Sequence, residues 1–104
     1  MFLVNIDHIP GTNFEVLGLV QGSVVLARDA GTGFMVGMAA MVGGEIVPYT
    51  QMLEDARRIA TERMEAAAER LAADAVINIR YTTSEVMNGA AEVLVYGTAV
   101  RYIS

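Results

Sequence analysis

The chain has 104 residues, 54% of them hydrophobic and 18% charged, with a formal net charge of −5 at pH 7. This length fits one domain over residues 1–104, and the composition is that of a globular chain. All seven basic residues are arginines and they are scattered, so the sequence lacks the clustered basic face that binds nucleic acid. Because cysteine is absent, disulfides, thiolate nucleophiles and thiolate metal sites are excluded.

Location and assembly follow from the same composition. The N-terminal residues turn acidic at Asp7 without a preceding basic segment, so we expect no signal peptide. The longest uncharged run, from Ala30 to Gly44, is shorter than the roughly 20 residues that span a bilayer. We therefore expect a cytoplasmic protein without a membrane span. The apolar fraction is high for so short a chain, which indicates that subunits bury apolar surface against one another.

Two extended segments open the chain. Residues from Phe2 to Ile6 read as a short strand, which Pro10 and Gly11 end. The run from Phe14 to Ala27 is rich in β-branched and aliphatic residues, and the glycines inside it predict a bulge.

The segment from Ala30 to Gly44 is rich in glycine and methionine. It predicts a short helix that is apolar all round and has to be covered by other protein. Because methionine fills irregular apolar interfaces, we interpret Met35, Met38 and Met41 as packing between subunits, with a thioether metal site as the alternative. The glycines also leave a phosphate-binding loop open as an alternative to close packing.

The stretch from Pro48 to Ala72 predicts a long helix. Apolar residues recur there with the period of a helix that covers a sheet. The predicted stripe comprises Leu53, Ala56, Ala60, Met64, Ala67 and Leu71. A ladder of charged residues four apart, Glu54, Arg58 and Glu62, follows the outer side. The alanines in the stripe predict a close approach of helix and sheet.

Two strands complete the chain, Val76 to Thr83 and Ala91 to Ile103, and they should pair antiparallel across an Asn88–Gly89 turn. The first alternates, with a predicted core face of Ile77, Ile79, Tyr81 and Thr83 and an opposite face of Asn78, Arg80 and Thr82. Arg80 and Glu92 are expected to form a cross-strand pair. Gly97 marks a bulge or a close approach of the backbone.

Three ordered segments resemble the YbjQ-like proteins, a bacterial family of unassigned function. They are residues Gly43 to Leu53, Arg70 to Arg80 and Gly89 to Val100, and Leu17 to Gly22 is a weaker match. The resemblance covers nearly the whole chain, and the three segments stand at matching separations.

The resemblance implies a two-layer α+β fold similar to the dodecin subunit, with a small antiparallel sheet packed against the long helix and a short apolar helix. It implies a closed homopentameric ring in which short strands bridge neighbours, and it carries a heavy-metal-binding label without a reaction. Relatives usually have glycine where Ala72 stands, so a left-handed cap at this position would cost this chain about 1 kcal/mol relative to glycine. They also tend to carry charges in the shorter helix, which this chain lacks from Ala30 to Gly44.

Candidate chemistry is sparse. His8 is the single imidazole, and a metal site would need symmetry-related copies, so we expect an exposed loop residue there. Asp74 stands at the junction of helix and strand, where a carboxylate accepts backbone N–H groups. The sequence offers no paired titratable groups, nucleophile elbow or triad. We therefore assign no catalytic, cofactor-binding or metal-ligating residue and name no cofactor, and a metal ion rests on the family label alone.

These observations favour an uncharacterised, ring-forming binding or assembly module whose partner is itself, with no inferable reaction. A first alternative is a protein that binds a small ligand or a metal ion at subunit interfaces. A second alternative is an enzyme with an active site between subunits.

Overall fold

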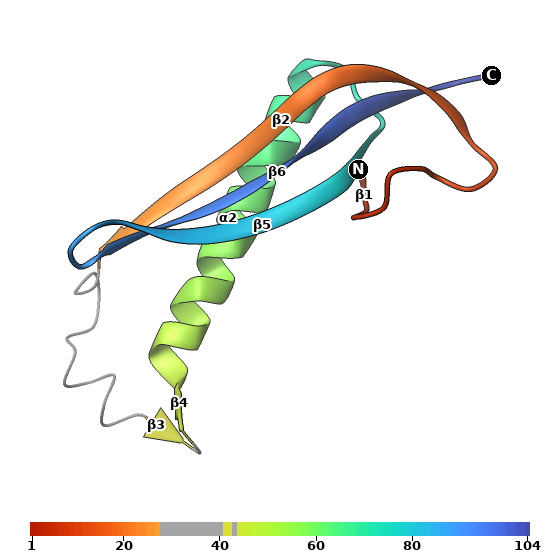
Figure 1. The fold of residues 1–104 in the computed structure, drawn as a ribbon. Helices are drawn as coiled ribbons and strands as arrows, with labels where there is room; N and C mark the ends of the chain where they lie inside the picture. Colours follow the sequence, from red (N-terminus) through yellow and green to blue (C-terminus); the bar gives the residue numbers. More distant parts are fainter. Residues whose placement is uncertain (28–40, 43) are drawn as a thin grey trace.

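A computed structural model describes residues 1–27, 41–42 and 44–104. Its elements, in chain order, are β1 (Phe2–Leu3), β2 (Asn13–Ala27), β3 (Met41–Val42), β4 (Glu45–Ile46), α2 (Val47–Arg70), β5 (Ala75–Met87) and β6 (Ala90–Ile103). Four strands form one sheet in the order β1-β5-β6-β2, and α2 crosses one of its faces (Figure 1). The predicted two-layer α+β architecture with one long helix is confirmed.

The sheet is mixed, so the prediction of a purely antiparallel sheet was wrong. The cause is the N-terminal segment, whose strand β1 lies parallel to the start of β5. Backbone hydrogen bonds continue this contact beyond β1, from Val4 N to Val76 O and from Ile79 N to Val4 O. The predicted strand from Phe2 to Ile6 is therefore shorter as a regular strand but stays attached to the edge of β5.

The predicted short apolar helix lies mostly outside the described residues. The described part of that segment includes Met41 and Val42, which pair antiparallel with Glu45 and Ile46 as β3 and β4. Within the described part of the chain, α2 is the only helix.

The strands β5 and β6 form the predicted antiparallel hairpin, and Asn88 and Gly89 make its turn. Gly89 has a φ of 83°, a conformation that glycine adopts without strain. Both strands extend closer to the turn than predicted. On its other side β6 pairs antiparallel with β2, with a bulge between Val16 and Gly18.

Asn78 interrupts the alternation of β5. Its φ is 56°, and the register between β5 and β6 shifts between Ile77 and Arg80. The predicted core face was therefore right for Ile79, which is buried in the core under α2, and wrong for the other three residues. Ile77 packs on the side of the sheet away from α2, Tyr81 and Thr83 are exposed, and the unpredicted Val76 is fully buried beneath the helix.

The predicted pair between Arg80 and Glu92 was also wrong. Arg80 lies opposite Tyr96, and Glu92 lies opposite Ser84. The Arg80 guanidinium instead donates a hydrogen bond to Asn5 O at 2.9 Å. The bulge at Asn78 and the greater length of both strands set this register.

The helix buries a narrow stripe of small residues, as predicted, but the end of the stripe differs. The buried residues are Ala56, Ala60, Met64 and Ala68. Ala67 is only partly buried, and Leu71 is exposed because α2 ends at Arg70. Gly22 of β2 lies directly under the stripe, where a Cβ atom would overlap the Ala60 carbonyl and the start of the next helical turn.

A left-handed residue closes the helix. Ala72 has a φ of 60°, Ala72 N donates to Glu69 O, and Ala73 N donates to Ala68 O. These two bonds define a Schellman motif, in which the left-handed position favours glycine. The expected left-handed cap at Ala72 is confirmed.

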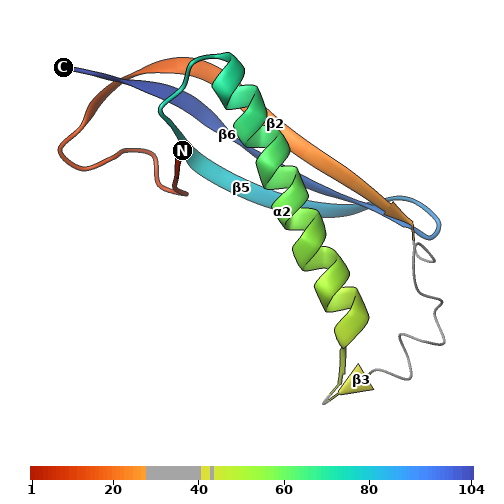
Figure 2. The ribbon, with the colours of Figure 1, turned by 180° about the vertical axis from the view of Figure 1, so that it is seen from behind.

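The hydrophobic core lies between α2 and the sheet (Figure 2). Its fully buried centre is made by Met64, Val76, Val93 and Val95. Gly97 permits the close packing, since a Cβ there would lie 2.6 Å from Val76 Cγ1 and 3.0 Å from Ile77 O. The predicted close approach at Gly97 is confirmed.

Candidate functional site

The residues singled out for chemistry do not come together. The His8 side chain is 66% exposed, and its Nδ1 lies 3.0 Å from Oδ1 of Asp7. This hydrogen bond, a further one from the backbone and the charge of the imidazole lower the pKa of the Asp7 carboxyl. Among the described residues, no group of three or more His, Cys, Asp or Glu side chains is close enough to hold a metal ion.

Asp74 has the structural position that its place in the sequence predicts. Its Oδ2 accepts the Tyr102 N–H at 2.8 Å, and its own N–H donates to Val100 O at 2.9 Å. The residue therefore ties the turn after α2 to the end of the central strand β6.

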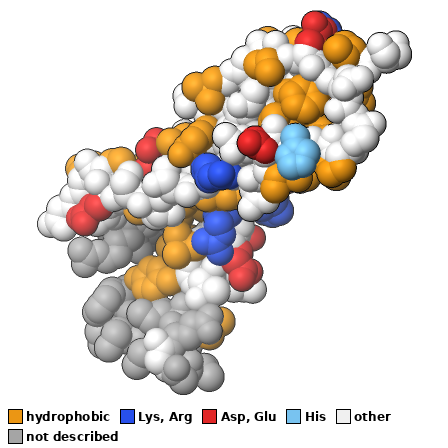
Figure 3. Space-filling view, turned by 45° about the vertical axis from the view of Figure 1, so that its right-hand side comes forward, with side chains coloured by type: hydrophobic (Ala, Val, Ile, Leu, Met, Phe, Trp, Pro, Cys, Tyr) orange, Lys and Arg blue, Asp and Glu red, His pale blue; other side chains and the backbone are white. Residues whose placement is uncertain are grey.

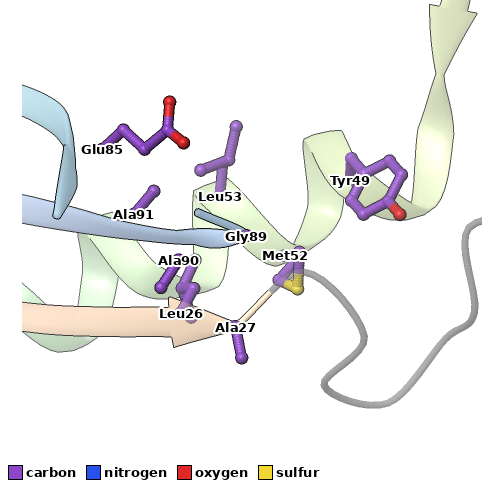
Figure 4. Close-up of a pocket in the computed structure, with 9 residues that line it drawn as sticks. All are labelled: Leu26, Ala27, Tyr49, Met52, Leu53, Glu85, Gly89, Ala90 and Ala91. Carbon is purple, nitrogen blue, oxygen red and sulfur yellow. The ribbon is translucent and has the colours of Figure 1, made fainter. Parts of the chain in front are cut away.

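One hollow opens where the sheet and the start of α2 diverge. We call it the wedge (Figure 4); its lining residues are Leu26, Ala27, Tyr49, Met52, Leu53, Glu85, Gly89, Ala90 and Ala91. Its volume is about 340 Å³, and Glu85 is the only charged side chain among these residues. The Tyr49 hydroxyl is buried and has no hydrogen-bond partner in the described structure. A pocket of this size and composition fits a small apolar molecule.

A second, polar hollow of about 490 Å³ lies between α2 and β5. Arg57, Arg58, Thr61, Glu62, Glu65 and Tyr81 line it. The Thr61 hydroxyl donates to Arg57 O at 2.7 Å and lies 2.8 Å from the Tyr81 hydroxyl. Arg58 is held by Asp55 and Glu62 in exposed ion pairs, so the hollow combines charges of both signs.

A third hollow, of about 450 Å³, lies on the other side of Tyr81 against the N-terminal segment. Its lining includes Leu3, Ile6 and Ile79, so it is more apolar than the second. The Tyr81 side chain, which is 49% exposed, borders both hollows. Sequence reasoning missed this role because the alternation of β5 assigned Tyr81 to the core.

The strongest surface feature is apolar. Large hydrophobic side chains are exposed on the two long outer strands of the sheet: Val16, Leu19 and Val25 on β2, and Tyr81, Val86 and Met87 on β5. Leu19 is 72% exposed and Met87 is 67% exposed. Figure 3 shows such side chains at the surface of the sheet, among the charged groups. This surface is suited to contact with other protein.

Within the described part of the chain, no helix has the length and apolarity needed to cross a bilayer. The long helix α2 carries charged residues along its exposed side, including Glu54, Arg58 and Glu62.

Comparisons with known proteins cover the full chain. A UPF0145 protein of Clostridium novyi is 52% identical over 99% of this chain and 100% of its own length. A UPF0145 protein of Thermotoga maritima is 47% identical over 97% of this chain and 96% of its own.

A solved structure shares the fold. It is a protein of unknown function from Pediococcus pentosaceus, assigned to the DUF74 family, with a TM-score of 0.70 and 19% identity over 99% of this chain and 98% of its own. The profile of the YbjQ family, described as "Putative heavy-metal-binding", matches residues 1–103. The chain therefore belongs to the YbjQ-like family, also called UPF0145, whose function is uncharacterised.

Proposed function

We propose that this protein is a self-assembling module that forms a closed ring, a homopentamer, in the cytoplasm, and that the ring creates a binding surface. The single observation that carries the proposal is the set of exposed hydrophobic residues on β2 and β5. A monomer of this size seldom leaves such side chains uncovered on both outer strands of its sheet, whereas a subunit interface buries them.

The small hairpin of β3 and β4 gives a second line of support. Each of its strands has two residues, and it stands at the start of α2, away from the main sheet (Figure 1). An isolated two-stranded hairpin is marginally stable in water, so a hairpin of this length gains most from a contact with another subunit. A short strand that bridges neighbours is what the family resemblance implies.

The mass of the particle in solution tests the assembly. We expect size-exclusion chromatography with light scattering to give about five times 11.1 kDa, independent of protein concentration. Leu19→Asp should lower this mass because it places a charge on the exposed apolar strand. Glu54→Lys, on the charged side of α2, is the matched control and should leave the mass unchanged. A wild-type protein that has the mass of a monomer at all concentrations would refute the proposal.

The wedge favours a second candidate function, the binding of a small apolar ligand. Its walls are hydrophobic apart from Glu85, and its volume is in the range of small-molecule sites. Titration with 1-aminoanthracene, a neutral fluorescent apolar probe, tests this. We expect saturable binding that Met52→Glu abolishes and that Glu62→Gln, in the polar hollow, leaves unchanged. Absence of saturable binding to the wild-type protein would refute the candidate.

A further inference from the structure

The backbone of β6 reveals which groups of the outer strands face outward. On the β5 side, Val100 O accepts from Asp74 N, and Tyr102 N–H donates to the Asp74 carboxylate. Successive residues of a strand direct their N–H and C=O groups to opposite sides, so the odd-numbered residues of β6, such as Ala99 and Val95, direct theirs to β2. From Gly18 onward, the even-numbered partners of these residues on β2 thus bond to β6, and odd-numbered residues face the open edge.

A side-chain contact agrees with this assignment. Arg63 of α2 donates to Ser23 O at 2.6 Å, so the carbonyl of this odd-numbered residue of β2 faces outward. The other outward-facing backbone groups belong to Leu19, Gln21 and Val25, and within the described structure no hydrogen bond reaches them. Among the described residues, no strand pairs with this stretch of β2, so it is an open edge there.

The residues of this β2 edge themselves lack the features that prevent strands from pairing, and Arg63 of α2 has to release the Ser23 carbonyl when another strand pairs there. From Gly18 to Ala27 it contains no charged residue and no proline, and Leu19 and Val25 are exposed on it. Proteins that stay monomeric protect such edges with lysine, proline, bulges or a covering segment. The bulge between Val16 and Gly18 lies before this stretch and leaves it unprotected.

The sheet has a second open edge on β5. The N-terminal segment covers β5 only as far as Ile79, which donates to Val4 O. Beyond it, Arg80, Thr82 and Ser84 face Tyr96, Leu94 and Glu92 of β6. By the same alternation, Tyr81, Thr83 and Glu85 direct their backbone groups outward. The register of β5 shifts again between Glu85 and Met87. The stretch from Arg80 to Met87 spans about 26 Å at the usual rise per residue, and the stretch of β2 from Gly18 to Ala27 spans about 33 Å.

We infer that these two edges are the two halves of one subunit interface: β2 of one copy pairs with β5, between Arg80 and Met87, of the next. This inference rests on the proposed assembly and names its contact. A ring needs a heterologous contact, in which two different surfaces of the same chain meet. Only an extended strand satisfies a row of free backbone groups, and the described residues offer one such row on each side of the main sheet.

The pairing also accounts for the exposed hydrophobic residues. Val25 stands on one edge, and Tyr81, Val86 and Met87 stand on the other, so edge-to-edge contact places each group beside a strand of another copy. Within one subunit, β2 and β5 both run antiparallel to β6, so they run in the same direction as each other. A rotation about a ring axis parallel to the strands keeps that direction. The contact between β2 of one copy and β5 of the next is therefore parallel.

Two proline variants test the interface. Val25→Pro and Thr83→Pro each remove one outward-facing N–H, at positions where the ladder to β6 does not use it. We expect each variant alone to fall towards the monomer mass of 11.1 kDa in size-exclusion chromatography with light scattering. An equimolar mixture retains one intact pair of edges, β5 of the first variant and β2 of the second. We expect the mixture to form a 1:1 heterodimer and nothing larger.

Each other result has a defined meaning. If both variants keep the wild-type mass, the edge interface is wrong while the assembly stands. If only Val25→Pro dissociates, β2 pairs with another surface, for example with itself, and the inference is overturned. A monomeric wild-type protein would remove the proposed function and this inference together. Circular dichroism checks that both variants fold; if a proline variant does not, Val25→Lys and Thr83→Lys replace the pair with the same readout. The control Leu94→Lys changes the central strand and should keep the wild-type mass.

Discussion

The hydroxyl of Tyr81 lies 2.8 Å from Oγ1 of Thr61 and joins the outer strand β5 to the helix α2. Thr61 Oγ1 also donates its single proton to Arg57 O. Tyr81 is therefore the donor in the contact with Thr61, and its lone pairs remain available to a donor in the polar hollow. The two bonds form a chain in which each strengthens the other.

This chain predicts a measurable coupling. Tyr81→Phe should lower the free energy of unfolding by about 0.5–1 kcal/mol, at the weak end for a hydrogen bond because Tyr81 is half exposed. Thr61→Val should have a similar effect, and the double variant should lose less than the sum of the two. Urea denaturation of the four proteins gives the coupling energy. Strict additivity would show that the two hydroxyls do not interact in solution.

The contact of sheet and helix at Gly22 predicts a larger effect. In Gly22→Ala the new methyl group would overlap the Ala60 carbonyl and lie 2.6 Å from Met64 N, both of which are backbone atoms of α2. The helix has to shift away from the sheet, and we expect a loss of about 2 kcal/mol or more in the free energy of unfolding. Gly11→Ala is the control: no atom lies within 4 Å, and only the strain of its φ of 71° remains, about 1 kcal/mol. Equal losses in the two variants would contradict the packing argument.

Much of the fold follows from local patterns in the sequence. The long helix is predictable because its 24 residues repeat small apolar side chains with helical spacing, and the β5–β6 hairpin because Asn88 and Gly89 suit a tight turn. The face of β5 could not be predicted, since one left-handed residue, Asn78, reverses the alternation and nothing beside it in the sequence indicates a bulge. Leu71 continues the apolar spacing of the helix but falls after the last helical residue.

The hollows and open edges depend on contacts between distant parts of the chain. The wedge combines Leu26, Met52 and Ala90, and no local pattern connects these three residues. The open edge of β5 exists because the N-terminal segment stops beside Ile79, which is a property of the pairing of β1. The sequence indicates that apolar surface is in excess, but the arrangement of strands decides where it is exposed.

The metal label of the family leads to a prediction for the purified protein. The chain has no cysteine and a single histidine, and soft or borderline metals prefer several thiolate or imidazole ligands. We expect mass-spectrometric metal analysis of tag-free protein to find less than one ion per chain, unchanged in His8→Ala. A stoichiometric metal that disappears in His8→Ala would contradict this and would point to a site shared between copies.

The pair of Asp7 and His8 predicts a pH effect with a definite sign. The contact with His8 lowers the pKa of Asp7 in the folded protein. A carboxyl pKa that is lowered by folding stabilises the folded protein at pH values above the carboxyl pKa of the unfolded chain. This stabilisation is lost as the pH falls through the carboxyl pKa of the folded protein. Carbon-13 NMR titration of the Asp7 carboxyl should show a midpoint that rises in His8→Ala. An unchanged midpoint would mean that the 3.0 Å contact is not kept in solution.

The left-handed cap of α2 offers a stabilising substitution. Ala72 adopts a φ of 60° at the Schellman position, where an alanine side chain meets the backbone and glycine does not. Ala72→Gly should therefore raise the free energy of unfolding, by up to about 1 kcal/mol, with part of the gain offset by the greater freedom of glycine in the unfolded chain. Ala73→Gly, one residue further along, is the matched control and should lower it, because Ala73 has no left-handed conformation to relieve and packs against the core. Thermal and urea unfolding of the three proteins decide the question, and a destabilised Ala72→Gly would show that the cap is not strained.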